Sequence, residues 1–448
     1  MKKIYSLQGN NENSEWDKDH AISFGITSKW LLFIAITLLG GYIVYQKIAG
    51  TPLEGHTLEW MDLILRWLHI IFGISWIGAS FYFVFLENSL DRNNPPRNEL
   101  AGNLWAVHGG GFYYLEKYKV APQKIPAHLH WFKYEAYFTW VTGTCLLAVV
   151  YYFNAESFLL SSDTEISALA GIGIGVGAIF FSLMVYTALS KTALLEPKNR
   201  PYFFIIMFVY LVGVAYLLMQ VFAPRAAYIH MGAIMGTMMA ANVFFVIIPA
   251  QKAMVFAAKE GKTYDTEIGK RAGWRSYHNN YFTLPVLFIM ISNHFPTTFG
   301  HEYNWVVLAI ISLAGAGIKH FHNVWERGEI NKWIVPISIL MLLFAFWFTA
   351  PESNNDAGSG DAVPFAKVKA IMNQRCTPCH SEYNSDDVFI TAQGGVKFDT
   401  PEEIVKFKDR ILNRAVITKS MPQGNKTEMT DEERSLLEAW IAQGAQLK

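Results

Sequence analysis

The strongest chemical signal in the sequence is two cysteines followed by a histidine, in the run Cys376-Thr377-Pro378-Cys379-His380. The spacing C-x-x-C-H is typical of covalent haem attachment, because the two thiols can add to the haem vinyl groups while the adjacent imidazole binds the iron. A zinc site or a thioredoxin-like redox pair explains the motif less well, since no second Cys/His pair lies nearby and no βαβ pattern surrounds it. The motif therefore predicts haem c, attached at Cys376 and Cys379, with His380 as an axial ligand.

A methionine on the C-terminal side of the motif could supply the second axial ligand. Met421, in the run KSMPQG, is favoured over Met429, which lies in a polar and acidic run typical of a helix start. Ligation by histidine and methionine raises the reduction potential of a haem, which suits an electron acceptor. The alternative is a core methionine that fills a gap. We therefore expect His380 and Met421 to bind the haem iron.

The composition of the whole chain indicates a membrane protein. Of its 448 residues 52% are hydrophobic and only 17% are charged, and 37 basic residues balance 37 acidic ones. So few charges do not fit a wholly water-soluble protein, and the lack of a basic surplus argues against an extended nucleic-acid partner. Three cysteines are also too few for a disulfide scaffold. About nine apolar segments are candidates for transmembrane helices, at 30–48, 61–87, 133–153, 167–189, 202–222, 227–249, 281–294, 304–319 and 333–349.

Lysine and arginine in the loops predict how these segments are oriented, because both residues are retained on the cytoplasmic side. The basic loops are 88–132, 190–201, 250–280 and 320–332. The alternating loops at 49–60, 154–166 and 295–303 contain neither residue, and 223–226 contains only Arg225. With nine crossings of a bacterial inner membrane, the N-terminus is cytoplasmic and the C-terminal segment periplasmic. The predicted organisation is a cytoplasmic tail, a transmembrane domain, a polar linker and a small soluble domain, at 1–29, 30–349, 350–361 and 362–448.

Two histidines occupy equivalent positions in a predicted internal repeat. His69 and His230 each lie near the start of an apolar segment that ends in three Phe and Val residues. The similar blocks WFKYEAYFT at 131–139 and WRSYHNNYFT at 274–283 then follow in the same order. This order favours a parallel repeat over chance similarity between aromatic-rich helices. The repeat would place both histidines at one depth, where they could ligate a haem b. A lone membrane histidine is otherwise often a hydrogen-bonded structural residue.

A second group of candidate catalytic residues lies in and after the long loop at 88–132. His108 precedes three glycines whose N–H groups could approach a ligand, and Glu135 begins the next apolar segment. His278 occupies the corresponding part of the second repeat. Each of the three residues could accept or donate a proton near neutral pH, whereas the alternative is that they anchor helix ends at the membrane surface.

Four segments in this order resemble the membrane-bound urate hydroxylase family, also called cytochrome c urate oxidases: HGGGFYYLEKY, LHWFKYEAYFTW, RAAYIHMGAIMGTMMAANVFFVIIPAQ and CTPCH. The resemblance runs from roughly Leu58 to the end of the chain, and the C-terminal domain resembles a class I cytochrome c. The expected fold is all-α, a polytopic bundle of about nine transmembrane helices with a parallel repeat, followed by that domain.

The resemblance implies oxidation of urate to 5-hydroxyisourate in purine catabolism. Water supplies the oxygen, and the electrons pass to the fused cytochrome c and not to dioxygen. A periplasmic or membrane electron acceptor, such as another cytochrome c or a terminal oxidase, would then be the downstream partner. Urate is a flat, mostly monoanionic ring, so it needs aromatic surfaces, N–H donors and one positive charge, for which Lys133 or Arg275 is suitable. The alternative is an electron-transfer module without urate chemistry, which oxidises a quinol or merely anchors the cytochrome.

Overall fold

The computed structural model describes residues 36, 39–41, 43–44 and 46–447, apart from 162–163, 193, 195–196, 327, 329–330, 351–360 and 387–391. The predicted tail at 1–29 and nearly all of the predicted linker at 350–361 lie outside the described residues. Contacts group Met61–Lys448 into one unit, separate from Met1–Trp60.

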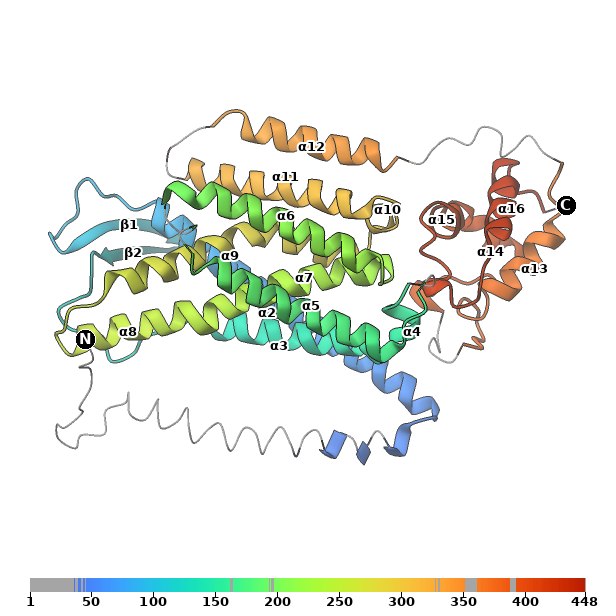
Figure 1. The fold of residues 1–448 in the computed structure, drawn as a ribbon, viewed down its shortest axis with the longest axis horizontal. Coiled ribbons are helices and arrows are strands. Elements are labelled where there is room, and N and C mark those ends of the chain that lie inside the picture. Colours follow the sequence, from blue (N-terminus) through green and yellow to red (C-terminus); the bar gives the residue numbers. More distant parts are fainter. Residues whose placement is uncertain are drawn as a thin grey trace. The chain divides into compact units, whose positions relative to one another are not determined.

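Most of the described chain is helical, as predicted (Figure 1). Before residue 350 the helices are α2 (Pro52–Asn88), α3 (Tyr134–Leu147), α4 (Ala155–Phe158), α5 (Ala168–Leu189), α6 (Arg200–Met219), α7 (Pro224–Asn242), α8 (Ile248–Lys259), α9 (Thr266–Ser292), α10 (Pro296–Phe299), α11 (Asn304–Trp325) and α12 (Ile334–Phe348). Short π-helical segments follow α3, at η1 (Ala148–Tyr152), and join α7 to α8, at η4 (Val243–Ile247).

Five of the described helical spans are long and apolar enough to cross a membrane. They are Leu53–Asn88, Ala168–Leu189, Arg200–Met219, Pro224–Lys259 and Asn304–Trp325, and Ile334–Phe348 is a shorter apolar helix. These spans agree with a membrane protein. The count of about nine crossings and the orientation in the membrane stay predictions.

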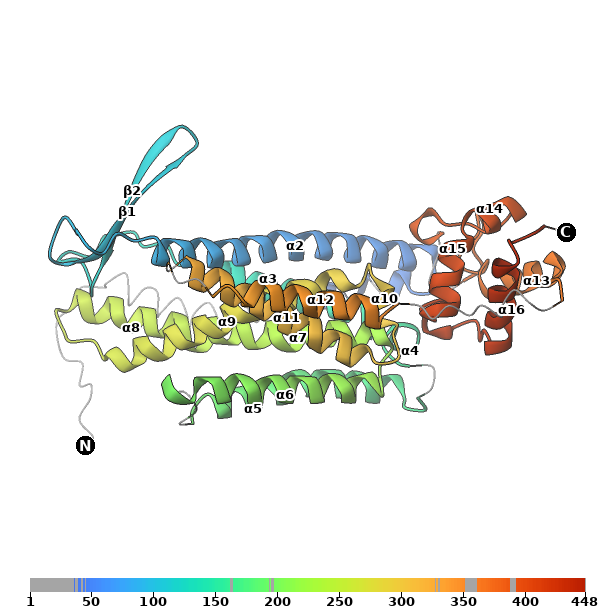
Figure 2. The ribbon, with the colours of Figure 1, turned by 90° about the horizontal axis from the view of Figure 1, so that it is seen from above.

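Helix α7 forms the centre of the bundle. Most of its residues are buried, and it contacts α3, α5, α6 and α9. Small side chains allow this close packing, since a Cβ atom at Gly232 would lie only 2.8 Å from Cγ2 of Ile289 on α9. In Figure 2, α5 and α6 lie on one side of α7 and α2 lies on the other.

The fold is not all-α, because the loop after α2 contains an antiparallel hairpin. Strand β1 (Leu100–His108) pairs with β2 (Gly111–Tyr118), and Figure 2 shows the hairpin extending away from the helices. Gly109 and Gly110 form the turn with φ angles of 58° and 80°, a backbone that glycine adopts without strain. Aromatic and β-branched residues favour extended strands, and the rings of Trp105 and Tyr114 pair across them at 4.7 Å. The prediction of an all-helical fold is therefore wrong for this segment.

Helix α9 is much longer than the apolar segment expected at 281–294. It begins after Asp265, whose side chain accepts a hydrogen bond from the Glu267 N–H at 2.9 Å, and it continues through Pro285. Its first half carries polar residues that are buried, including Arg275, His278 and Asn279. A search for apolar runs misses this half, because neighbouring helices and not lipid surround its polar side chains.

The described residues after the linker form short helical segments around a separate hydrophobic core. These include α13 (Phe365–Arg375), α14 (Pro401–Lys406), α15 (Lys408–Ile411), the π-helical η6 (Leu412–Ile417) and α16 (Asp431–Ala442). Thr430 caps α16, because its hydroxyl accepts from the Glu433 N–H at 3.3 Å and the Glu433 carboxylate accepts from the Thr430 N–H at 2.9 Å. Trp440 of α16 is 1% exposed and packs against Phe365 of α13.

Candidate functional site

The two cysteines and the histidine of the C-x-x-C-H motif lie in one compact turn at the end of α13. Cys376 is the C-cap of the helix, and its N–H donates to the Met372 carbonyl at 2.9 Å. The His380 N–H then donates to the Cys376 carbonyl at 3.0 Å. Neither thiol forms a disulfide, and both cysteines are only partly buried. The turn therefore brings the predicted attachment points and the predicted iron ligand together without any disulfide.

A backbone carbonyl fixes one nitrogen of the His380 imidazole. Its Nδ1 lies 3.0 Å from the carbonyl oxygen of Val396, so Nδ1–H donates there and Nε2 keeps its lone pair. Burial lowers the pKa of His380, which favours the neutral ring that can bind a metal. The ring centre lies 5.4 Å from that of Phe398. These residues fit a covalently attached haem.

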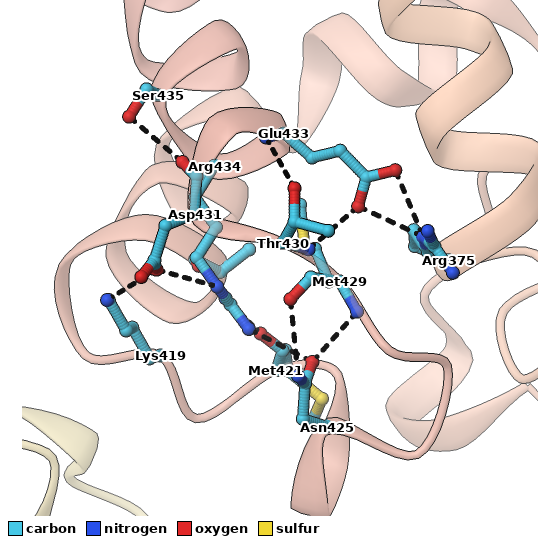
Figure 3. Close-up of polar contacts among 11 residues, drawn as sticks. Arg375, Lys419, Met421, Asn425, Met429, Thr430, Asp431, Glu433, Arg434 and Ser435 are labelled. Carbon is cyan, nitrogen blue, oxygen red and sulfur yellow. Dashed lines mark hydrogen bonds and ion pairs between the residues drawn. The ribbon is translucent and has the colours of Figure 1, made fainter.

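The two candidate methionine ligands have different surroundings, as Figure 3 shows. Met429 is 3% exposed and belongs to the hydrophobic core of this segment. Met421 is only partly buried and lies in a loop, where its N–H donates to the Arg414 carbonyl at 2.9 Å and its carbonyl accepts from Nη1 of Arg434 at 2.8 Å. Arg434 is itself buried and also donates to the Ala415 carbonyl. A core role accounts for Met429 but not for Met421.

The structure places His69 and His230 against different helices. Nδ1 of His69 lies 3.0 Å from the Thr139 carbonyl oxygen of α3, and the side chain lines a large cavity. His230 is 0% exposed, and its Nε2 lies 3.1 Å from the Tyr152 hydroxyl. A Cβ atom at Gly175 of α5 would lie 2.8 Å from that same Nε2. The two rings are thus held in separate environments.

The three predicted catalytic residues also lie in different parts of the structure. His108 is exposed at the tip of the β1–β2 hairpin. Glu135 lies in the first turn of α3, where Oε1 is 4.0 Å from Nε2 of His130, and Oε2 is buried with no hydrogen-bond partner among the described residues. His278 alone lies inside the bundle, where it is 1% exposed.

His278 belongs to a buried polar network that sequence reasoning missed. The Tyr186 hydroxyl of α5 lies 2.7 Å from Nδ1 of His278 and accepts from Nδ2 of Asn242 at 2.8 Å. Asn242 also donates to Oδ1 of Asn279 at 2.8 Å, and Asn279 donates to the Met239 carbonyl at 3.0 Å. The sequence feature that could have revealed this network is Asn242, an amide in the apolar run of α7. Polar groups at such positions need hydrogen-bond partners from other helices.

Three nitrogen atoms on α9 are buried and have no hydrogen-bond partner among the described residues: Nε1 of Trp274, Nη1 of Arg275 and Nε2 of His278. The Arg275 guanidinium lies 4.7 Å from the ring centre of Tyr186. Phe203 of α6 stacks on His278, with ring centres 4.5 Å apart and an interplanar angle of 10°. N–H donors, one positive charge and aromatic faces are the groups that would bind a flat organic anion.

Trp274 and His278 also line a cavity of about 650 Å³ between α6, α7, α9 and α11. Arg200 lines the same wall, with its guanidinium 4.3 Å from the ring centre of Trp274. Most of the other lining side chains are apolar, including Met231, Leu308 and Trp305. The volume is within the range of about 300–1,000 Å³ found for small-molecule sites.

Comparison with known proteins identifies one family. Residues 55–350 match the family described as Urate oxidase N-terminal, over more than half of the chain. No curated protein and no solved structure matches the chain. The matched range contains every helix of the bundle from α3 to α12, nearly all of α2, and the β1–β2 hairpin.

Proposed function

The chain belongs to the urate oxidase N-terminal family, and from this we propose that its helix bundle oxidises urate and passes the electrons to a haem c in its C-terminal segment. The family match over residues 55–350 carries the proposal. The product would be 5-hydroxyisourate. Urate monoanion and water together yield neutral 5-hydroxyisourate, one proton and two electrons, so dioxygen is not needed.

The unpartnered donors of α9 support a urate site beside His278. Arg275 would balance the negative charge of urate, and the N–H groups of Trp274 and Arg275 would donate to its carbonyl oxygens or ring nitrogens. Because these donors are buried, hydrogen bonds to a ligand would stabilise the protein: each buried donor without a partner destabilises the folded state by about 1–3 kcal/mol. The network therefore gains stability when a ligand of matching polarity binds.

His278 would accept the proton that the reaction releases. In the tautomer with hydrogen on Nδ1, that N–H donates to the Tyr186 hydroxyl oxygen, and Nε2 is left to act as a base toward the substrate. Asn242 and Asn279 hold Tyr186 and α9 in this arrangement. His108 and Glu135 would not touch a substrate bound here.

The C-terminal segment would hold the electron acceptor. When bound, a haem c accepts electrons one at a time through its iron. Cys376 and Cys379 would attach it, His380 and Met421 would ligate the iron, and Val396 orients the His380 ring. Membrane insertion, a periplasmic C-terminal segment and a downstream acceptor complete the proposal. A reporter fused after Lys448 should behave as an exported protein.

Anaerobic reduction of the haem by urate tests the proposed function. Urate added to membranes that contain the protein should produce the absorption bands of ferrous haem c, and His278→Gln should block this reduction while the haem stays attached. Intact haem c that urate does not reduce in the wild-type protein would contradict the proposal.

Quinol oxidation is a second candidate, favoured by the largely apolar lining of the cavity beside His278. To test this function, a quinol is added in place of urate in the same anaerobic assay. Haem reduction by quinol and not by urate would identify this second function.

A further inference from the structure

A second large cavity, of about 580 Å³, lies between α2, α3, α5, α7 and α9. The urate site proposed above does not use it. The volume is within the range for cofactor-sized ligands. Both of its arginines, Arg66 and Arg225, come with Asn293 and His294 from one end of these helices, and His69 lies one turn further along α2. The remaining lining is mostly apolar or aromatic, so the occupant should be a largely apolar molecule with a charged edge.

Glycines make parts of the cavity wall flat. Gly73 of α2 and Gly236 of α7 both line it, and a Cβ atom at either position would have no other atom within 4 Å. These two glycines therefore border open space, whereas Gly232 one turn away is packed against Ile289 and Met290. Backbone surfaces without side chains allow a flat, rigid ring system to lie against the helices.

His69 lines this cavity, and its ring could supply a metal-binding nitrogen. Its Nδ1 lies 3.0 Å from the Thr139 carbonyl oxygen and 3.2 Å from the Thr142 hydroxyl. A carbonyl partner fixes the hydrogen on Nδ1 and leaves the lone pair on Nε2, as for metal-ligating histidines in general. The ring is held tightly, because a Cβ atom at Gly143 of α3 would lie 2.8 Å from its Cε1.

His230 does not offer such an atom. Its Nδ1 lies 2.8 Å from the Ala226 carbonyl oxygen, and its Nε2 faces the Tyr152 hydroxyl. Both ring nitrogens therefore have partners, and His230 is not among the residues that line the cavity. The two histidines that the repeat relates are not equivalent as ligands.

Two arginines stand at the polar end of the cavity. Arg66 is one turn from His69 on α2 and also pairs with Asp62 at 2.6 Å. Arg225, at the start of α7, donates from Nε to Oδ1 of Asn293 at 3.1 Å. Guanidinium groups bind carboxylates through paired hydrogen bonds, so this end suits a ligand with carboxylate groups at one edge.

We propose that this cavity binds a b-type haem, with Nε2 of His69 as a ligand of the iron and with Arg66 and Arg225 at the propionates. The flat glycine walls, the held imidazole and the arginine pair each match a different part of that molecule. Binding of this haem does not depend on what the bundle oxidises.

The role of the haem rests on the proposed function. Each urate releases two electrons, and a haem held by His69 would supply one-electron redox chemistry between the urate site and the haem c site. A hydrocarbon core of roughly 30 Å separates the two sides of the membrane, so an intermediate carrier shortens each transfer. Asn293 directly follows the last turn of α9. At the same end of the bundle, Phe348 at the end of α12 contacts His301, and the chain then continues to the C-terminal segment.

Haem content measured without urate tests the proposal. Acidified acetone extracts haem b and leaves haem c on the protein, and pyridine haemochrome spectra then quantify both fractions. The wild-type protein should contain one extractable and one covalent haem per chain. His69→Ala should lose the extractable haem and keep the covalent one, and added imidazole should restore b-type absorbance in His69→Gly.

Matched controls separate this proposal from a general loss of structure. His230→Gln should keep the extractable haem. Gly236→Leu, which fills the cavity, should lose it, whereas Gly213→Leu at an open position on α6 outside the cavity should not. A wild-type protein with haem c alone, or full haem b content in His69→Ala, would overturn the proposal. Failure of urate to reduce a protein that contains both haems would instead contradict only the proposed function.

Discussion

The C-x-x-C-H turn of the C-terminal segment and the bundle around His69 each fix a histidine ring through a backbone carbonyl, but the two arrangements arise differently. In both, Nδ1 lies 3.0 Å from a backbone carbonyl oxygen, Val396 for His380 and Thr139 for His69. His380 follows Cys379 directly in the sequence, whereas His69 and Thr139 are 70 residues apart on separate helices. A local motif identifies the first site, and only packing between helices creates the second.

This difference predicts how each region responds to substitution. In the proposed haem c site, loss of Cys376 or Cys379 would remove a covalent bond that no other residue replaces. In the bundle, each ligand or substrate contact comes from a different helix, so one substitution weakens binding and leaves the other contacts in place. The effects should therefore decrease from the motif to the network and then to the supporting loops.

The largest effect should come from replacing both cysteines of the motif. Cys376→Ser with Cys379→Ser should abolish covalent haem completely, because a hydroxyl does not form the thioether bond. Haem staining after denaturing electrophoresis measures this directly. Cys145→Ser is the matched control, since Cys145 is exposed on α3, and the stain should be unchanged. Covalent haem that persists in the double variant would show that Cys376 and Cys379 are not the attachment sites.

Arg275→Gln should weaken urate oxidation without abolishing it. A hydrogen bond to a charged group contributes about 1.5–3 kcal/mol, so kcat/KM for urate should fall about 10- to 100-fold. Arg271→Gln, one turn earlier on α9 and exposed, should have little effect. Both values come from anaerobic haem reduction at a series of urate concentrations. Equal losses in the two variants would indicate a general charge effect and not a binding contact.

Substitution of the two methionines of the C-terminal segment should affect different properties of the protein. Met421→Leu should lower the reduction potential of haem c and slow its reduction, because the iron loses its thioether ligand. Met429→Leu should leave the potential unchanged and cost less than about 1.5 kcal/mol of stability, since the swap conserves core volume. Redox titration measures the first effect and thermal unfolding of the haem band the second. A lower potential in Met429→Leu alone would reverse the ligand assignment.

The smallest effect should come from the cap of α16. Thr430→Ala removes the hydroxyl that accepts from the Glu433 N–H, and such a loss typically costs about 1 kcal/mol. The thermal midpoint of the haem c band should therefore decrease slightly, with no change in haem attachment. Ser435→Ala, at an exposed position on the same helix, should leave the midpoint unchanged. A loss of haem in Thr430→Ala would mean that the cap also supports the ligand loop.

The sequence predicted well those features that depend on neighbouring residues. The Cys376 to His380 motif needs only one turn of chain, and the structure forms that turn at the end of α13. Apolar segments of membrane length also correspond to helices, because hydrocarbon requires backbone groups to be satisfied within the segment. The preference for Met421 over Met429 as the second iron ligand came from local composition and stays a prediction.

Other features depend on which segments meet in space, and the sequence could not determine them. The hairpin of β1 and β2 escaped a search for long apolar runs, because strands alternate over short distances. The sequence indicates His278 as a candidate catalytic residue and Arg275 as a possible charge for urate, but Tyr186, which contacts both, lies on another helix. The internal repeat in the sequence predicts that His69 and His230 are equivalent. Packing made them different, since Nε2 of His230 lies 3.1 Å from the Tyr152 hydroxyl, whereas His69 lines a cavity that His230 does not reach.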